Sequence, residues 1–304
     1  MKLGWKTRVG LVLSAVWLCL VFLVADEYQR MGQVLGSAKQ MTVDDQWKLM
    51  MDDRNLQSDR LRTTIVAALK DDPAQRDLAA LLEKWDGVDR ADQAAPLVYQ
   101  SLYREIALGT FTDKLGEGVA KDMLSTWYFW QQRFDALVGT PDSPWFDDPR
   151  TKDKRETLAD VIRAAAPRAR ASIEALQGKD LAAWAWGKAH TLSFVSPLRR
   201  SGAGQELAGG FTVQRPGSGE TLNRGVYDFQ KPFAVNFFPS MRVVVDFADP
   251  DKINAVVAGG VSERHFQPHQ NDQARILVAG ERRSWWFNPK QVEAHAKSRA
   301  TLSP

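Results

Sequence analysis

Hydrophobic positions recur at helical spacing through much of the chain, from about residue 42 to residue 176. The clearest set follows the i, i+3, i+4, i+7 pattern and consists of Leu78, Leu81, Leu82 and Trp85. This spacing places all four side chains on one face of a helix. Gly87 follows directly and is well placed to end that helix. We therefore predict an amphipathic helix that stops just before Gly87.

Two further stretches carry helix signals. Thr42 and Asp45 have the spacing of a capping box, and hydrophobic residues follow them at near-helical intervals, namely Trp47, Met50, Met51, Leu61, Ile65 and Leu69. A second hydrophobic stripe comprises Leu158, Val161, Ile162, Ala165, Ala169 and Ile173. Pro167 lies inside that stripe and is expected to kink or divide the helix. Its arginines, Arg163, Arg168 and Arg170, are interpreted as a solvated face.

The last third of the chain has a different pattern. Glycines and polar residues crowd residues 201–225, which predicts a loop. Two short β-type runs follow at 242–247 and 254–258, separated by the turn-forming Asp249-Pro250-Asp251. Asn288-Pro289 then has the composition of a helix start. We predict a β-rich segment that ends in a helix.

Together these patterns predict an α+β protein, with a helical part at residues 31–190 and a β-rich part at residues 191–304. Residues 1–30 have the composition of a signal anchor or a signal peptide. Lys2, Lys6 and Arg8 precede residues 9–25, which carry no charge. As a helix, these 17 residues would span about 26 Å, close to the roughly 30 Å of a bilayer core.

We favour an uncleaved anchor, because Leu23 and Ala25 are a poor match to the small residues of a signal-peptidase site. The basic residues should stay on the cytoplasmic side and direct the rest of the chain outward. This predicts a single-pass protein of the inner membrane with its body in the periplasm. If the segment is cleaved, the body is instead secreted to the periplasm.

Composition limits the function classes. The 304 residues are 44% hydrophobic and 25% charged, as in globular proteins, and the net charge is only +3. A nucleic-acid partner is therefore not expected. Cys19 is the only cysteine and lies in the N-terminal apolar run. An intrachain disulfide is thus excluded, and so is a thiol nucleophile in the body of the protein.

Histidines offer one candidate metal site. His265 and His269 are four residues apart with Asp272 nearby, and a helix would place both histidines on one face to bind zinc. Pro268 disfavours that helix, so structural roles are favoured over a metal-dependent hydrolase. His190, which follows an aromatic patch at Trp184 and Trp186, is likewise interpreted as a structural, hydrogen-bonded histidine.

Other catalytic motifs are weak. The acidic pairs at 44–45, 52–53, 71–72 and 147–148 are interpreted as surface and cap positions, because consecutive residues diverge in direction on a helix. Gly202 and Gly204 are followed by Leu207 where a dinucleotide fingerprint needs glycine. The chain contains no Gly-x-Ser-x-Gly string. The aromatic run at 127–130 could line a pocket, although a core role is favoured.

An ordered set of motifs resembles the penicillin acylase (penicillin amidase) family. In chain order these are Trp-Asp-Gly at 85–87, Trp-Phe-Asp-Asp at 145–148, Trp-Ala-Trp-Gly-Lys-Ala-His at 184–190, Pro-Ser-Met-Arg-Val-Val-Val-Asp at 239–246, Gly-Gly-Val-Ser at 259–262 and Pro-His-Gln-Asn-Asp-Gln at 268–273. The likeness covers roughly residues 42–297. One departure follows Ser262, where the family usually has glycine and this chain has Glu263-Arg264.

The resemblance implies an N-terminal-nucleophile hydrolase of αββα architecture, of which this chain would be the C-terminal part of the catalytic β-subunit. In such enzymes a serine opens the subunit, and its own α-amino group, with a pKa near ~8, accepts the serine proton. The family's Ser-Asn-Asn-Trp and Asn-Trp-Asn strings do not occur here. In the family they lie upstream of the helix that starts at Thr42, and here a membrane segment occupies that place. We assign no catalytic, cofactor-binding or metal residue and expect no cofactor.

The leading hypothesis is an amidohydrolase of linear amides, such as acylated β-lactams or acyl homoserine lactones, that is inactive alone. A separately encoded N-terminal acylase half would complement it. A cut at Gly36-Ser37 would make Ser37 a new N-terminal nucleophile, but its neighbours do not fit and the oxyanion asparagine is missing. The alternative is a non-catalytic, membrane-anchored binding or scaffold protein.

Overall fold

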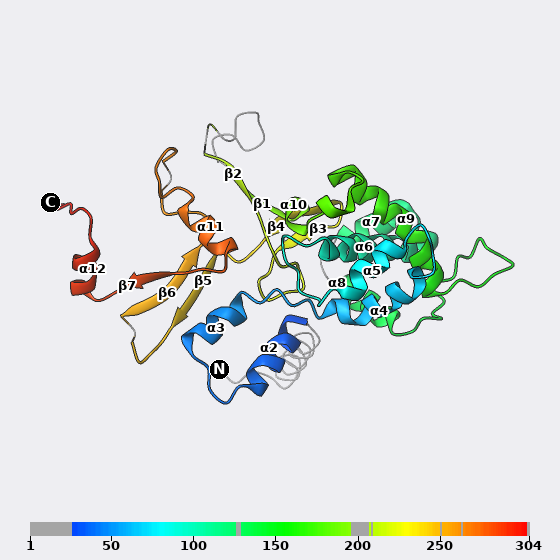
Figure 1. Cartoon of the computed structure of the whole chain (residues 1–304), viewed down its shortest axis with the longest axis horizontal. Coiled ribbons are helices and arrows are strands. Elements are labelled where there is room, and N and C mark those ends of the chain that lie inside the picture. Colours follow the sequence, from blue (N-terminus) through cyan, green and yellow to red (C-terminus); the bar gives the residue numbers. More distant parts are fainter. Residues whose placement is uncertain are drawn as a thin grey trace, which may run out of the picture. The chain divides into compact units, whose positions relative to one another are not determined.

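A computed structural model describes residues 26–125, 129–195, 207, 209–249, 251–262 and 264–302. Helices come first along the chain and strands follow, so the mixed α+β composition predicted from the sequence is confirmed (Figure 1). Residues 9–25, the predicted membrane segment, lie outside the described residues. Among the residues that are described, no helix is long and apolar enough to cross a bilayer.

The chain forms two compact units. The first comprises the residues up to Ala38, Asp52–Leu192 and Gln214–Phe237; the second comprises Lys39–Met51, Ser193–Val213 and Phe238–Pro304. The helices of the first unit are α2 (Asp26–Ser37), α4 (Gln57–Leu69), α5 (Arg76–Lys84), α6 (Ala94–Leu115), α7 (Glu117–Ser125), α8 (Phe129–Val138), α9 (Leu158–Gln177), the 3-10 helix η1 (Leu181–Ala183) and α10 (Trp186–Ala189).

Helix α6 is the centre of the first unit. It packs against α9, α7 and α5, and α4 also packs on α9 (Figure 1). Residues on several faces of α6 are buried, including Leu97, Val98, Leu102 and Ile106. A helix that is apolar all round is stable only when neighbouring helices surround it. The α9 stripe supplies one such surface through Leu158, Ile162, Ala165, Ala169 and Ile173, as predicted.

Local signals at the helix ends are largely confirmed. Thr42 and Asp45 form the predicted capping box, and Asn288 caps the last helix. Helix α5 ends at Lys84, and Gly87 follows with a positive φ of 76°. Of the two outcomes predicted for Pro167, a kink or a division of the helix, division was wrong, because α9 runs from Leu158 through Pro167 to Gln177.

A four-stranded sheet has the order β2–β1–β4–β3, formed by β1 (Thr191–Phe194), β2 (Phe211–Gln214), β3 (Val226–Asp228) and β4 (Lys231–Phe237). Strand β1 is parallel to β4, with Leu192 opposite Val235, and β3 is antiparallel to β4. Strand β2 corrects the prediction of a continuous loop over residues 201–225. The strand signal of Phe211 and Val213 was obscured by the glycines on either side.

The second unit contains α3 (Val43–Met50) and an antiparallel sheet of β5 (Met241–Val245), β6 (Lys252–Val257) and β7 (Arg283–Trp286), together with α11 (Asp272–Val278) and α12 (Pro289–His295). The two predicted β runs correspond to β5 and β6, within a few residues at each end. Four buried residues form the core of this unit: Trp47, Val244, Val256 and Leu277. The Trp47 indole also donates to the backbone oxygen of Gly280, 2.8 Å away.

Candidate functional site

A cavity of about 630 Å³ in the first unit is the best candidate for a ligand site. Helices α6 and α8, strands β3 and β4 and the preceding loop at 219–224 supply its walls. The aromatic wall residues are Tyr103, Trp130, Tyr227, Phe229 and Phe237. The charged wall residues are Arg104, Glu220, Arg224 and Asp228. The cavity thus combines apolar surface with a few polar groups, as ligand pockets commonly do.

Glu220 is the most perturbed acid of the cavity. Burial raises the pKa of Glu220 to about 8, and the nearby carboxylates of Glu27, Asp26 and Asp135 act in the same direction. Arg224 opposes them by favouring the charged form. A carboxyl group with a pKa near neutrality in a cavity is a common mark of a functional position, although structural networks produce the same shift.

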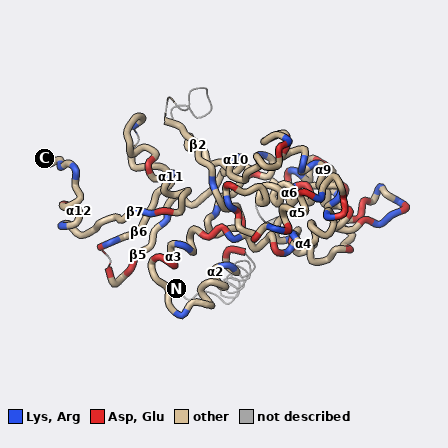
Figure 2. The backbone as a smooth tube through the Cα atoms, in the orientation of Figure 1, with Lys and Arg blue, Asp and Glu red and all other residues tan. Residues whose placement is uncertain are grey.

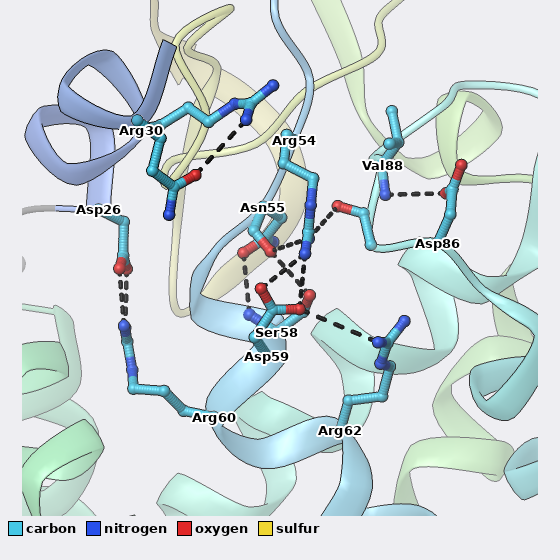
Figure 3. A network of polar contacts seen from close by, with 12 residues as sticks. Asp26, Arg30, Arg54, Asn55, Ser58, Asp59, Arg60, Arg62, Asp86 and Val88 are labelled. Carbon is cyan, nitrogen blue, oxygen red and sulfur yellow. Dashed lines mark hydrogen bonds and ion pairs between the residues drawn. The ribbon is translucent and has the colours of Figure 1, made fainter. Parts of the chain in front are cut away.

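Two of these carboxylates, Asp26 and Glu27, belong to helix α2, which is held by ion pairs (Figure 3). Asp26 accepts two 2.7 Å hydrogen bonds from Arg60, and Arg60 also donates to Asp135 at 2.7 Å. Glu27 accepts from Arg224 at 2.6 Å. Asp26 is only 4% exposed, so its charge depends on the Arg60 guanidinium.

The loop that carries Glu220 is fixed by buried polar groups. Asn223 donates to Asp53 at 3.0 Å, and the backbone N–H of Gly217 donates to the oxygen of Asp89. Burial raises the pKa of Asp53 and of Asp89 to about 7. For Asp53, the Asn223 hydrogen bond opposes that rise, and for Asp89, bonds from Ser218 and Asn55 do so.

The Trp-Asp-Gly motif shapes the neighbouring turn. Asp86 accepts from the backbone N–H of Val88 at 3.1 Å, and the Trp85 indole donates to the Val88 oxygen at 2.9 Å. A Cβ on Gly87 would lie 2.1 Å from the guanidinium of Arg54. Arg54 is itself bonded to both carboxylate oxygens of Asp59 (Figure 3). The motif therefore specifies a turn.

The second tryptophan motif has a comparable structural role. The His190 ring stacks on Trp186 with 4.4 Å between centroids, and His190 Nδ1 lies 2.9 Å from the oxygen of Phe233. A carbonyl can only accept, so Nδ1 carries the proton and Nε2 is unprotonated. Burial lowers the pKa of His190 to about 3. This agrees with the structural interpretation of His190.

The two other predicted histidines have separate partners. His265 Nδ1 lies 3.4 Å from Gln270 Oε1, whereas His269 Nδ1 lies 3.0 Å from Asp272 Oδ2. Asp272 also pairs with Arg283 at 3.0 Å. Over the described ranges, no three His, Cys, Asp or Glu side chains are grouped so that they could hold a metal ion. Glu263, at the departure from the family pattern, lies outside those ranges.

The remaining candidates are scattered. Ser37 is exposed at the end of α2, where its hydroxyl donates to the Val34 oxygen at 2.9 Å. Trp127 and Tyr128 of the aromatic run lie outside the described residues, while Trp130 lines the cavity. No catalytic residue was predicted, and nothing in the structure tests that assignment.

One acid and one arginine were misjudged as free surface groups. Asp53 is half-buried and accepts a hydrogen bond from Asn223, so it is not the free surface acid that was predicted. Arg170 pairs with Asp77 and bonds Gln75, and its side chain is only 20% exposed. The sequence analysis did not single out Glu220 at all. Its only local signal is its position among Gly219, Thr221 and other turn-forming residues, which indicates a loop but not a cavity.

Charged residues elsewhere in the first unit do not mark a second site. Acidic and basic residues are interspersed along its helices (Figure 2). Some of them form exposed pairs, such as that between Lys121 and Glu117, at 2.6 Å, one turn apart on α7. Such exposed pairs contribute little to stability.

Comparison with known proteins shows the family to which the sequence is similar. Residues 25–294 match the penicillin amidase family, so the match begins earlier than the region near residue 42 predicted from the motifs. The acyl-homoserine lactone acylase QuiP of Pseudomonas fluorescens is 29% identical over 238 residues, which are 75% of this chain and 28% of that protein. QuiP of Pseudomonas aeruginosa is 30% identical over 244 residues, which are 73% of this chain and 28% of that protein.

A solved structure has a similar fold. A thermostable penicillin G acylase from Alcaligenes faecalis superimposes with a TM-score of 0.54 and 16% sequence identity. The superposition covers 90% of this chain and 52% of that one. The chain thus spans about 28% of the length of the curated relatives named above. With the family match extending over residues 25–294, the chain belongs to the penicillin amidase family.

Proposed function

We propose that this chain is the C-terminal part of the catalytic subunit of an amidohydrolase, and that it hydrolyses linear amides only together with a separately encoded N-terminal half. The family match over residues 25–294 carries the proposal. The two QuiP relatives are named acyl-homoserine lactone acylases, which supports acyl homoserine lactones as substrates. Acylated β-lactams are a second class of linear amide to test.

The missing chemistry supports the need for a second half. The 304 residues lack both the Ser-Asn-Asn-Trp and the Asn-Trp-Asn strings of the family. In the family, those strings carry the N-terminal nucleophile and the oxyanion asparagine. On this proposal the chain is inactive alone, and its two sheets belong to an αββα sandwich that the other half completes.

Complementation tests the proposal. The chain would be co-expressed with the upstream portion of QuiP from Pseudomonas aeruginosa, ending where its similarity to this chain begins. We expect release of homoserine lactone from an acyl homoserine lactone only when both polypeptides are present. Each polypeptide alone is the matched control. Turnover by the purified chain alone would refute the proposal, and so would a stable but inactive complex of the two.

A non-catalytic binding protein is the second candidate, and the 630 Å³ cavity is the observation that favours it. Such a protein would bind a small molecule without turning it over. Ligand binding by the chain alone, combined with failure of complementation, would favour this function over amide hydrolysis.

We also propose that residues 9–25 anchor the chain in the inner membrane and that its body lies in the periplasm. The uncharged run behind three basic residues supports this location. The full chain should stay in the membrane pellet after alkaline carbonate extraction and should be digested by protease added to spheroplasts. Recovery of the chain in the soluble fraction, or protection from that protease, would contradict the anchor and the orientation respectively.

A further inference from the structure

The charges that line the cavity are unequally neutralised. Arg104 donates to Glu105 at 2.6 Å and to the oxygen of Phe229 at 3.0 Å. Arg224 donates to Glu27 at 2.6 Å. Each of these wall arginines is therefore paired with a glutamate that does not line the cavity, and Arg104 is also bonded to a backbone oxygen. Neither is a strong site for a further anion.

The carboxylates of the wall are in the opposite situation. Asp228 accepts a 2.7 Å hydrogen bond from the backbone N–H of Gln230, which is a neutral partner in the same turn. Within the part of the chain that the structure describes, neither Asp228 nor Glu220 forms an ion pair. The cavity therefore presents two acidic groups that lack a cation.

Aromatic rings supply most of the remaining wall. Trp130 and Phe229 meet edge to face with 5.6 Å between centroids. The hydroxyl of Tyr103 donates to Asp135 and that of Tyr227 donates to Gln100, so both tyrosines have their hydrogens committed. Aromatic faces attract cations through the ring quadrupole. Arg104 already uses this interaction, with its guanidinium carbon 4.9 Å from the centroid of Phe229.

We propose that this cavity binds a small organic cation, with a primary ammonium group against Glu220 and an aromatic or aliphatic body between Trp130 and Tyr227. Its volume, about 630 Å³, lies within the range of small-molecule pockets. The proposal does not depend on amide hydrolysis, because the groups that carry it are all present in this chain.

Other ligand classes fit the cavity less well. An anion would meet two carboxylates and two arginines that are already paired. A neutral apolar molecule would leave Asp228 without a charged partner in a partly desolvated site, which is unfavourable. An organic cation satisfies both the carboxylates and the aromatic walls.

Calorimetric titration of the full chain with benzylammonium tests the proposal. Benzyl alcohol is the neutral control of the same shape, and phenylacetate is the anionic control. We expect benzylammonium to bind at least about tenfold more tightly than either control, since a desolvated ionic contact contributes roughly this much or more. Equal affinity for benzylammonium and benzyl alcohol would overturn the proposal.

Variants locate the site. Glu220→Gln should weaken benzylammonium binding at least about tenfold, because it removes the charge and keeps the shape. The matched control is Glu117→Gln, which removes an exposed carboxylate of α7 and should leave the affinity unchanged. Trp130→Leu provides a second test of the same site through loss of the aromatic wall. Unchanged affinity in either cavity variant, with the fold retained by circular dichroism, would overturn the proposal.

The pH dependence gives an independent readout. The charged groups around Glu220 are Glu27 and Asp26 from α2, Asp135 from α8 and Arg224 from its own loop. Because burial raises the pKa of Glu220 to about 8, the empty cavity holds it mostly protonated at neutral pH. Binding of a cation should release that proton, so affinity should rise between about pH 6 and pH 8. Glu220→Gln should abolish the rise, and persistence of the rise in that variant would refute the assignment to Glu220.

Discussion

Single residues decide whether the loop that carries Glu220 can close. Gly217 has a positive φ of 77°, and a Cβ there would lie 2.3 Å from the backbone oxygen of Asn223. Both features require glycine at this position. The backbone N–H of Gly217 also donates to the oxygen of Asp89, which ties the loop to the Trp-Asp-Gly turn.

Gly217→Ala should therefore lower the free energy of unfolding by more than the backbone strain of a positive φ would by itself. Gly178→Ala is the matched control, since Gly178 has a φ of 81° but open space around its Cβ position. We expect the control to cost about 1–2 kcal/mol from the left-handed backbone and Gly217→Ala to cost roughly 1–3 kcal/mol more from the clash. Urea unfolding measures both values. Equal losses would show that the loop accommodates the methyl group.

His190 should give the protein an acid-sensitive stability. Its pKa falls from 6.5 in the unfolded chain to about 3 in the native fold, chiefly through burial. Between these values only the unfolded state binds the proton, so the free energy of unfolding decreases as the pH falls from 6.5 toward 3. The loss approaches about 1.4 kcal/mol per pH unit.

Comparison with His190→Gln isolates this contribution, because the buried carboxyl groups of Asp53 and Asp89 remain in both proteins. The difference in unfolding free energy between wild type and variant should shrink as the pH is lowered from about 7 to about 4.5. Parallel pH profiles would mean that His190 does not stay neutral in the native fold.

Residue-level chemistry was only partly predictable from the sequence. The stop at Gly87 and the structural role of His190 were predicted because turn and aromatic signals are local. Asp53 was mistaken for a surface acid because the partner that buries it, Asn223, is 170 residues away. Glu220 was missed for the same reason: the carboxylates that perturb it come from α2 and α8.

At the level of elements, ion pairs attach α2 to the rest of the first unit. Its first turn places Asp26 on Arg60 and Glu27 on Arg224, and its next turn places Arg30 on Asp52 at 2.6 Å. Of these acids, Asp26 is the most enclosed. A buried carboxylate that loses its cation is destabilising by several kcal/mol.

Arg60→Met should therefore loosen α2. The substitution keeps the apolar stem of the side chain and removes the guanidinium shared by Asp26 and Asp135. Because Arg60 is 36% exposed, we expect a reduced loss of about 2–3 kcal/mol. Hydrogen exchange of the α2 amides should become faster. Lys121→Met, which breaks an exposed pair on α7, is the control, and equal exchange in the two variants would contradict the proposed attachment.

Elements were better predicted than their partners. Capping boxes and strand runs depend on a few consecutive residues. The sequence therefore predicted the starts of α3 and α12 and the approximate positions of β5 and β6. Pro167 does not divide α9, because a proline is tolerated where tertiary packing holds a helix and α9 packs along α6. Strand β2 was hidden because glycine-rich flanks resemble loop, whereas its pairing with β1 is a long-range interaction.

For the molecule as a whole, the two units have unequal cores. The first unit encloses long stripes from α4, α5, α6 and α9, while the core of the second consists of Trp47, Val244, Val256 and Leu277. Stability scales with the apolar area removed from water. The second unit should therefore open first.

Native-state hydrogen exchange in low denaturant measures this order. We expect the amides of β5, β6 and β7 to exchange at lower denaturant than those of α6 and α9. Val256→Ala, which truncates a fully buried side chain of the smaller core, should widen the gap by about 1 kcal/mol or more. Simultaneous exchange of all these elements would show that the two units unfold as one.

The bond between Asn223 and Asp53 also has a consequence for synthesis on the ribosome. The two residues are separated by 170 positions, so at ~5–20 residues per second Asp53 is added to the nascent chain roughly 9–34 s before its amide partner. During that interval the nascent helical region must keep this carboxylate hydrated. The first unit can therefore reach its final form only after most of the polypeptide has been made.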